Sequence, residues 1–551
     1  MSKHEKEESS QKHRKDSIVS SSHESLAKLR GSSGIKGLVQ NPYVFATAIF
    51  ASIGGVLFGY DQGVISGVQE MPTFIARFPM NDAINGFVVS ILELGAWFGA
   101  LIVGYFADRL GRKYSIVVFS VVFLLGSSIQ GGAQNIGYLL GGRFVTGMGV
   151  GAMSMLVPLY QSEIAPPEIR GSLVSLQQLA VTFGIFISFW IDYGCNNIDG
   201  EAQWRVPLCI QIAFALILGV GILFFPHSPR WLMSVDREQE ALQVLSQLRR
   251  LSIDHPLVQE EWREIKITVE FDREVERQTY PHLLEQGNRG RMKITALSYL
   301  ELFKKATRKR LFIGCVIMFF QQFIGVNALI YYAPKIFKSV GLTGDTVSLL
   351  ATGVVGIINL VLTIPTVLFL DQLGRKPILL VASVGLTISM LIIAVITGLF
   401  EDNWEAHRTE GWVAIVFVYI FIANFAYSWG PIAWVIPAEI FPLRTRAKAM
   451  SISTSANWMC NFIIGLVVPP MLSNIKFGTY VFFCVFCALS FFFVLFFVPE
   501  TKGRSLEEMD EIFGGQEAAK DDAIMSRVKE QVARTSIPGV KPETTQTGPT
   551  V

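Results

Sequence analysis

The chain has 551 residues, of which 51% are hydrophobic and only 17% carry charge. A soluble protein of this length is about one quarter charged, and the formal net charge of +2 gives no sign of a nucleic-acid partner. The composition therefore argues against a soluble or nucleic-acid-binding protein. It indicates a chain that crosses a membrane many times.

Apolar segments long enough to cross a bilayer, for which about 20 residues are needed, recur along the chain. The first of them follows a Ser-rich, charged stretch that contains no apolar run typical of a signal peptide. We therefore expect residues 1–42 to form a disordered cytosolic tail. The twelve expected spans lie at 43–66, 84–106, 114–133, 137–160, 173–192, 205–226, 311–337, 347–370, 377–400, 411–437, 448–472 and 477–498.

The spans divide the chain into two halves. We expect a six-helix half over 43–227, a polar linker over 228–310, a second six-helix half over 311–498 and a polar cytosolic tail over 499–551. Apolar residues at three- and four-residue spacing in 240–250 predict short helices in the linker. Lys and Arg concentrate in the N-terminal tail, the linker and every second loop, so the positive-inside rule places both termini and the linker in the cytosol.

Short motifs recur after corresponding spans of the two halves. DRLGRK at 108–113 follows span two, and DQLGRK at 371–376 follows span eight. EIAP at 163–166 follows span four, and EIFP at 439–442 follows span ten. Because the matches fall in the same order and at the same places, they indicate a duplicated six-span unit, as in many secondary transporters.

The charged residues of these motifs are candidates for a cytoplasmic latch. The glycine allows a tight turn, and the basic side chains can pair with acidic groups at neighbouring helix ends: Glu163 with Arg109 or Arg112, and Glu439 with Arg375. Basic loops also occur simply to fix topology. Both interpretations stay open, although acidic residues at matching places favour the latch.

The seventh span carries polar side chains, which are costly in a bilayer and usually face a cavity or a partner helix. Gln321, Gln322 and Asn327, followed by Tyr331 and Tyr332, lie within one apolar segment. On a helix, Gln322, Asn327 and Tyr331 would share about half of the circumference. From this stretch alone, lining a polar cavity and joining neighbouring helices are equally good interpretations.

Seven motifs in order give a more specific signal: 108–113, 157–166, 170–171, 228–232, 321–332, 430–434 and 499–504. With them, the chain resembles the sugar porters of the major facilitator superfamily over about 43–514, and in particular fungal transporters of monosaccharides. The resemblance implies an all-α membrane protein of twelve transmembrane helices in two six-helix halves, with short cytoplasmic helices between them. It also implies a sugar as cargo.

The chemistry of a sugar fits the polar residues within the spans. Amides donate to and accept from hydroxyl groups without charge, and aromatic side chains suit the apolar face of a sugar ring. Most candidates lie in the second half, which we expect to hold the sugar while the first half closes over it. By resemblance, the sugar-contacting positions are Gln178, Gln321, Gln322, Asn327, Asn359, Trp434 and Asn457.

Three neighbouring side chains are left out of this set, and two others receive a different role. Trp429, Trp458 and Asn461 are not assigned to sugar binding. Tyr331 and Tyr332 lie farther toward the outer face, and we expect them to form an extracellular gate that closes over the sugar.

Two charged residues suggest how transport is driven. Asp61 lies late in span one and Arg143 early in span four, so both fall in the outer half and can meet. The resemblance to proton symporters implies Asp61 as proton acceptor and Arg143 as its partner, although facilitators of the family also carry this Asp, and a structural ion pair stays open. Glu93 is a second carboxylate within a span; no family role is assigned to it, and pairing with Arg143 or with a neighbouring backbone is open.

The function predicted is uptake of a monosaccharide by alternating access with proton symport. Uncoupled facilitation, a non-transporting sugar sensor and a polyol or quinate transporter are alternatives. The histidines lie in tails, in loops or at a span end, and no metalloprotease or phosphate-loop motif is present, so we expect no enzyme, metal or cofactor. The expected partners are the sugar, the proton and the lipid bilayer, with a monomer as the functional unit in the plasma membrane.

Overall fold

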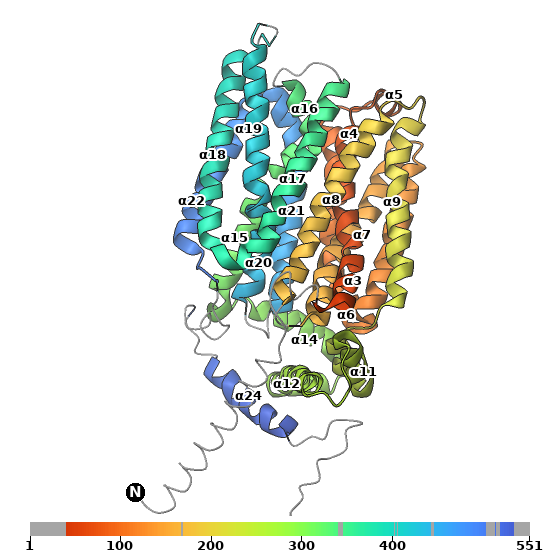
Figure 1. Ribbon diagram of the computed structural model, residues 1–551, viewed down its shortest axis with the longest axis vertical. Helices are drawn as coiled ribbons and strands as arrows, with labels where there is room; N and C mark the ends of the chain where they lie inside the picture. Colours follow the sequence, from red (N-terminus) through yellow and green to blue (C-terminus); the bar gives the residue numbers. More distant parts are fainter. Residues whose placement is uncertain are drawn as a thin grey trace, which may run out of the picture.

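The computed structural model describes residues 40–166, 169–339, 345–401, 403–404, 406–441, 446–502, 513 and 518–533. Across these residues every regular element is a helix. Long helices run roughly side by side as one bundle, and shorter helices lie beneath one of its ends (Figure 1). Most of the predicted N-terminal tail and much of the predicted C-terminal tail lie outside the described residues.

The long helices follow the predicted order of spans. The first half contains α3 (Pro42–Ala51), α4 (Ile53–Val68), α6 (Asp82–Gly131), α7 (Ile136–Ile164), α8 (Arg170–Cys195) and α9 (Ala202–Gly221), with the short α5 (Pro72–Arg77) after α4. The second half contains α15 (Lys305–Phe323), α16 (Val326–Ser339), α17 (Asp345–Leu373), α18 (Arg375–Phe400), α19 (Arg408–Ala426), α20 (Trp429–Ile440), α21 (Arg446–Asn474) and α22 (Gly478–Phe497).

Helix α6 contains two spans rather than one. Its 50 residues would extend about 75 Å as a straight helix, more than twice the hydrocarbon thickness of about 30 Å. The backbone leaves the helical conformation at Gly111, where φ is 81° and ψ is 164°. The rings of Phe106 and Phe119, on either side of this point, lie 5.5 Å apart, so the two legs fold back on each other. The eleven apolar helical segments of the described chain therefore provide twelve spans, as predicted.

Replacement of Gly111 by alanine should destabilise the protein. The backbone there has a conformation that costs about 1–3 kcal/mol with any side chain, and an added Cβ would lie 2.8 Å from the ring of Trp231. Gly104, in the same helix, has no atom within 4 Å of an added Cβ and provides the matched control. Thermal unfolding of the purified variants should show a lower Tm for Gly111→Ala than for Gly104→Ala; equal values would contradict this account.

The seventh and tenth spans are broken. Gly325, with φ 98°, separates α15 from α16, and an added Cβ there would lie 2.8 Å from the ring of Phe483. Tyr427 and Ser428 separate α19 from α20. Gln322 and Asn327 lie on opposite sides of the break. The prediction that Gln322, Asn327 and Tyr331 share one side of a continuous helix is therefore wrong. Broken helices at depth in a membrane protein are typical of binding sites in transporters.

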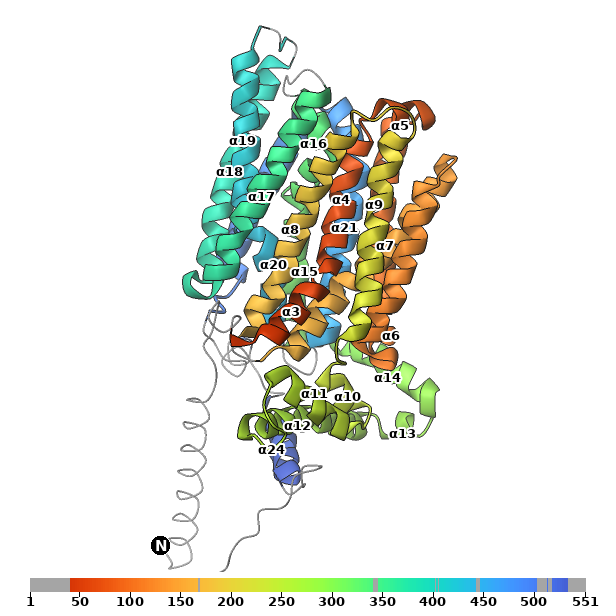
Figure 2. The same ribbon diagram turned by 45° about the vertical axis from the view of Figure 1, so that its right-hand side comes forward.

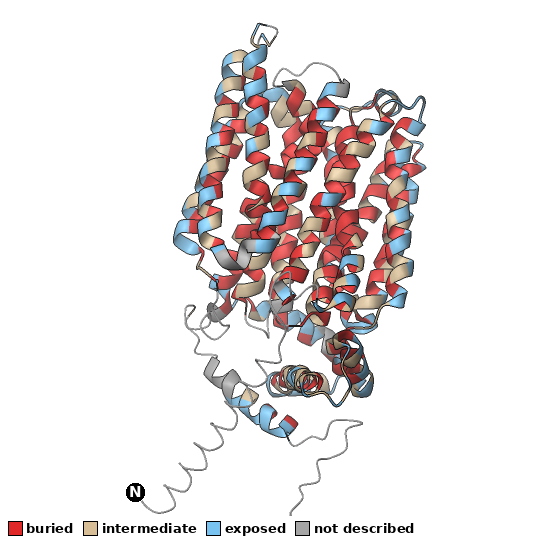
Figure 3. Cartoon of the chain, in the orientation of Figure 1, coloured by how far each residue is buried: buried red, intermediate tan, exposed pale blue. Residues whose placement is uncertain are grey.

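The outer surface of the bundle is apolar. Leu399, Phe496 and Val381 are 70%, 72% and 65% exposed, and exposed positions alternate with buried ones along the outer helices (Figure 3). Water would disfavour so much exposed apolar surface, whereas lipid accommodates it. The fold and its surface together define a protein that passes through the membrane many times.

The linker forms the short helices that were predicted. They are α10 (Pro229–Ser234), α11 (Glu238–Arg249), α12 (Pro256–Thr279), α13 (Pro281–Leu284) and α14 (Gly287–Glu301). They lie beneath one end of the bundle in both views (Figures 1 and 2), which we call the linker end; the opposite end is the far end. Helix α24 (Ala518–Ala533), in the predicted C-terminal tail, packs Val528 and Val532 against Phe271 and Val275 of α12.

Candidate functional site

Four of the predicted amides form one hydrogen-bonded cluster where α15, α16 and α21 meet. Asn457 Nδ2 donates to Gln321 Oε1 at 2.6 Å, and Gln322 Nε2 donates to Asn457 Oδ1 at 3.2 Å. Asn327 Nδ2, beyond the helix break, donates to Gln322 Oε1 at 2.5 Å. All four side chains are buried, at 2–5% exposure. We call Gln321, Gln322, Asn327 and Asn457 the amide cluster.

The break between α19 and α20 holds one end of this cluster. Gln321 Nε2 donates to the backbone carbonyls of Trp429 and Gly430 at 3.1 and 3.0 Å. Trp429 is fully buried, and its indole N–H donates to Ser383 Oγ at 3.0 Å. The sequence alone assigns no role to Trp429. Its indole N–H inside a span is the one signal for such a role, because a buried N–H group needs a partner.

The remaining three predicted contacts lie around the cluster but are not bonded to it. Gln178 of α8 places its Nε2 3.4 Å from the position of a Cβ on Gly430, so it faces the second half from the first. Asn359 of α17 is buried, and Trp434 of α20 is half-buried. Within the described residues no hydrogen bond joins these three side chains to the amide cluster. The structure thus gathers four of the seven positions and places one more across the interface.

The predicted gate tyrosines are buried, each with 1% exposure. The Tyr331 hydroxyl lies 2.6 Å from Glu93 Oε1 and 3.1 Å from Asn461 Oδ1, and it accepts a hydrogen bond from Gln62 Nε2 at 2.9 Å. Gln62 and Glu93 belong to the first half, so this hydroxyl joins the two halves. Tyr332 instead donates to the carbonyl of Gly465 at 2.6 Å, within its own half.

Other contacts also close the far end. Lys338 Nζ lies 2.6 Å from Glu70 Oε2, which links α16 to the chain after α4. Helices α6 and α21 approach so closely that a Cβ on Gly86 would lie 2.6 Å from the carbonyl oxygen of Leu466. The two halves therefore touch at the far end through an ion pair, a tyrosine and direct backbone packing.

Asp61 and Arg143 meet inside the first half, as predicted. Arg143 Nη1 lies 3.8 Å from Asp61 Oδ1, and the two side chains are 1% and 0% exposed. The arginine is anchored by hydrogen bonds to the carbonyls of Val88 and Val89 at 2.7 and 3.3 Å. Neither Asp61 oxygen has a hydrogen-bond partner among the described residues, so Arg143 supplies its compensation through charge alone. A buried carboxylate held in this way is suited to changing its protonation state.

The repeated loops adopt the same conformation in both halves. Gly374, with φ 88° and ψ 155°, matches the values given above for Gly111. Arg112 Nη2 lies 2.8 Å from Glu163 Oε1, and Arg375 Nη2 lies 2.8 Å from Glu439 Oε1. The equal geometry supports the inferred duplication. Each pair stays within its own half, so in this conformation neither one ties the two halves together.

Arg109 does not join these pairs. Its guanidinium group lies over the ring of Tyr105 and donates to the tyrosine hydroxyl. Tyr105 is one helical turn earlier on the same face and is 54% exposed, so Arg109 points away from the bundle. The alternative pairing of Glu163 with Arg109 is therefore wrong, and Arg112 is its partner.

Each loop is also covered by the segment that follows the last span of its half. The Trp231 indole N–H donates to the carbonyl of Asp108 at 3.0 Å. Glu500 accepts hydrogen bonds from the backbone N–H groups of Arg375 and Lys376, both at 3.0 Å. Burial alone would raise the pKa of the Glu500 carboxyl, but these and neighbouring N–H groups hold its pKa below the ordinary value. The motifs at 228–232 and 499–504 therefore bind the equivalent loops of the two halves.

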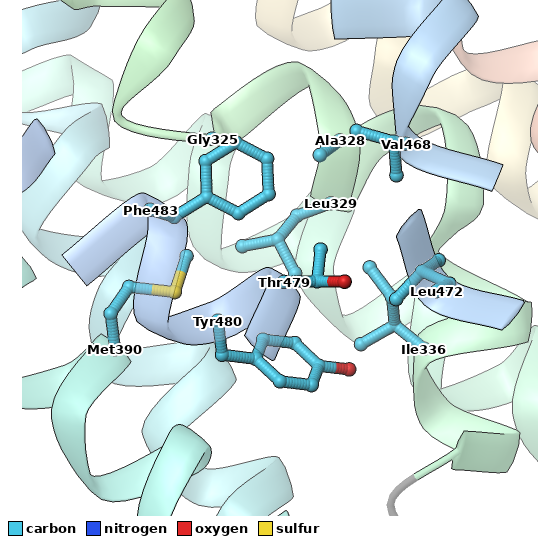
Figure 4. Close-up of a pocket in the computed structure, with 10 residues that line it drawn as sticks. All are labelled: Gly325, Ala328, Leu329, Ile336, Met390, Val468, Leu472, Thr479, Tyr480 and Phe483. Atoms are coloured by element: carbon cyan, nitrogen blue, oxygen red, sulfur yellow. The ribbon is translucent and has the colours of Figure 1, made fainter. Parts of the chain in front are cut away.

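A small pocket lies behind the break at Gly325, and it is not the amide site. It lies between α16, α18, α21 and α22. Its lining includes Leu329, Met390 and Phe483, with Thr479 and Tyr480 as hydroxyl-bearing members (Figure 4). None of the ten lining side chains is an amide or carries charge. It offers no set of groups for a sugar.

Two duplicated six-span halves, broken helices at a polar cluster and a buried ion pair define a secondary transporter of the major facilitator type. Comparison with known proteins agrees with this class. Residues 47–513 match the family model described as sugar (and other) transporter. The chain therefore belongs to the sugar porters of the major facilitator superfamily, and it is a membrane transporter rather than an enzyme.

Individual relatives show the range of the family. The chain is 36% identical to an MFS glucose transporter, mfs1, of Aspergillus flavus, over 84% of this chain and 88% of that protein. It is 34% identical to a quinate permease of Neurospora africana, over 86% of this chain and 89% of the permease. Among solved structures, the proton:xylose symporter XylE of E. coli matches with a TM-score of 0.68 and 29% identity, over 86% of this chain and 99% of XylE.

Proposed function

We propose that this transporter takes up a monosaccharide by alternating access. The observation that carries the proposal is the amide cluster, a connected set of uncharged donors and acceptors at the two helix breaks. Each amide is bonded to another amide or to backbone, and a sugar hydroxyl can replace such a bond in kind. Gln178 would complete the site from the first half.

The cluster also joins α15, α16 and α21, which was the alternative interpretation of span seven. The two roles are compatible if the amides exchange their mutual hydrogen bonds for bonds to sugar. An uncharged site favours a neutral sugar over quinate, because a carboxylate needs a positive partner when it is buried. The relatives include both a glucose transporter and a quinate permease, so the preference rests on the site and not on the comparisons.

We further propose that uptake is coupled to protons through Asp61 and Arg143. A proton on Asp61 would release Arg143 and favour the sugar-binding conformation, which links the two substrates. The structural relative is described as a proton:xylose symporter, which supports this assignment. Tyr331 and Tyr332 would serve as the gate at the far end, and Arg112–Glu163 with Arg375–Glu439 would hold each half rigid at the linker end.

The orientation completes the proposal. Basic residues concentrate at the linker end, so that the linker and both termini would be cytosolic, the far end extracellular, and the host membrane the plasma membrane. The functional unit would be a single chain, since the amide cluster and the ion pair are both formed within it.

Uptake in a transport-deficient host cell tests the cargo. Cells that express the chain at the surface should take up at least one labelled hexose or pentose with saturation, and excess unlabelled sugar should block this uptake. Quinate should neither be taken up nor compete. Uptake of quinate alone, or no uptake of any sugar by protein present at the surface, would overturn the proposal, the second outcome in favour of a sensor.

A further inference from the structure

Glu93 is a buried carboxylate to which the proposed function gives no role. It lies in the first leg of α6 and is 0% exposed. Its Oε1 atom lies 2.6 Å from the Tyr331 hydroxyl, whereas Oε2 has no hydrogen-bond partner in the described part of the chain. Its hydrogen-bond partner is therefore a tyrosine of the opposite half, whereas Arg143, one of the partners that the sequence left open, acts on it through charge.

The Tyr331 hydroxyl has one proton but two acceptors within reach. It can donate to Glu93 Oε1 or to Asn461 Oδ1, while Gln62 Nε2 donates to it. If Glu93 is ionised, Tyr331 donates to the carboxylate, and Asn461 Oδ1 loses its donor. If Glu93 carries a proton, it donates to Tyr331, and Tyr331 donates to Asn461. Only the protonated form satisfies all three contacts at once.

The charges around Glu93 also favour its protonated form. The charged groups near it are Asp61 of α4 and Arg143 of α7. Two tyrosines of α16, Tyr331 and Tyr332, are the titratable groups that face it, and α21 contributes the neutral Asn461. One arginine thus faces two buried carboxylates. Arg143 directs Nη1 toward Asp61 and is otherwise bonded to backbone carbonyls of α6. When Asp61 is ionised, the net charge of Asp61, Arg143 and Glu93 together is zero only if Glu93 is protonated.

We propose that Glu93 is a second proton-binding site, occupied when the far end is closed, and that its proton holds the two halves together through Tyr331. Deprotonation would leave an uncompensated negative charge between the halves and unpair Asn461, so it would favour opening. This inference rests on the proposed function for the direction of opening, and it assigns to Glu93 a role in gating that is separate from coupling at Asp61.

Sugar exchange at equal pH on both sides of the membrane tests the gate without a proton gradient. Full-length protein is reconstituted in liposomes, and counterflow of a transported sugar is measured from about pH 5 to about pH 9. The wild-type rate should fall at alkaline pH by about fivefold or more, because the closed state is lost from the cycle. Asp61→Asn removes the pH dependence that the coupling site would contribute, and this variant should keep the alkaline fall. Glu93→Gln stays neutral and keeps its hydrogen bonds, so the double variant Asp61→Asn/Glu93→Gln should be nearly independent of pH. An alkaline fall in the double variant equal to that of Asp61→Asn would overturn the proposal.

Infrared spectroscopy of the same samples tests the protonation state directly. The wild type at neutral pH should show a carbonyl stretch from a buried carboxylic acid, absent from Glu93→Gln, shifted in Tyr331→Phe and retained in Asp61→Asn. The same band in Glu93→Gln would contradict the assignment even if transport by that variant is poor. If wild-type sugar accumulation proves independent of a proton gradient, coupling at Asp61 fails, whereas the band and the counterflow profile still decide the role of Glu93.

Discussion

Replacing Gln322 with alanine is expected to abolish sugar uptake or to raise the apparent KM by about tenfold to a hundredfold. Gln322 is bonded to Asn327 and Asn457 and also lies 3.5 Å from Gln321 Oε1. Its loss leaves two buried polar atoms, Asn327 Nδ2 and Asn457 Oδ1, without the partner that Gln322 supplies, and it would remove a proposed contact to the sugar. Each unsatisfied group costs about 1–3 kcal/mol, which corresponds to that change in affinity.

A matched variant separates the site from a general effect of losing a buried amide. Gln130 is also fully buried, but its side chain bonds to Thr146 within the first half. Gln130→Ala should therefore retain the wild-type KM. Surface expression of both variants is measured together with initial uptake rates over a range of sugar concentrations. Wild-type uptake by Gln322→Ala would remove the amide cluster from the binding site.

Asp61→Asn is expected to abolish uphill accumulation of sugar while preserving exchange. Asparagine has nearly the same shape but cannot change its charge, so proton and sugar movement lose their link. The change also leaves Arg143 without its buried counter-charge, and a slower exchange rate is expected for this reason. Counterflow measures exchange, and the ratio of internal to external sugar at steady state measures accumulation. Strong accumulation by Asp61→Asn would exclude this residue as the coupling site.

The spans were predictable from the sequence because a bilayer imposes a length and a composition on each crossing. The duplication was also readable, and equal conformations at Gly111 and Gly374 now explain why both loops keep a glycine. The breaks at Gly325 and Ser428 were not predictable. A glycine within an apolar run does not break a helix by itself; the ring of Phe483, far along the chain, fills the space beside Gly325.

The site was predictable in its residue types but not in its connections. The resemblance supplied Gln321, Gln322, Asn327 and Asn457, and their mutual bonds follow only from the approach of α21 to the broken span. Asn461 lies one turn after Asn457 and could have been chosen on that spacing.

Glu93 was visible as a carboxylate within a span, but its partner was not. Tyr331 is 238 residues away, and no local pattern connects the two. The same holds for Arg109 and Arg112, which the sequence offered as equal partners for Glu163. Only the direction in which each side chain leaves the helix separates them.

The coupled movement of sugar and protons is the central claim, and one measurement tests it most directly. Liposomes containing the full-length protein and a trapped pH indicator receive a transported monosaccharide on the outside, without any initial pH gradient. Symport predicts that the interior becomes acidic as sugar enters, and that a protonophore abolishes this acidification without stopping sugar entry. Sugar entry with no change in internal pH would contradict proton coupling and identify the chain as a facilitator.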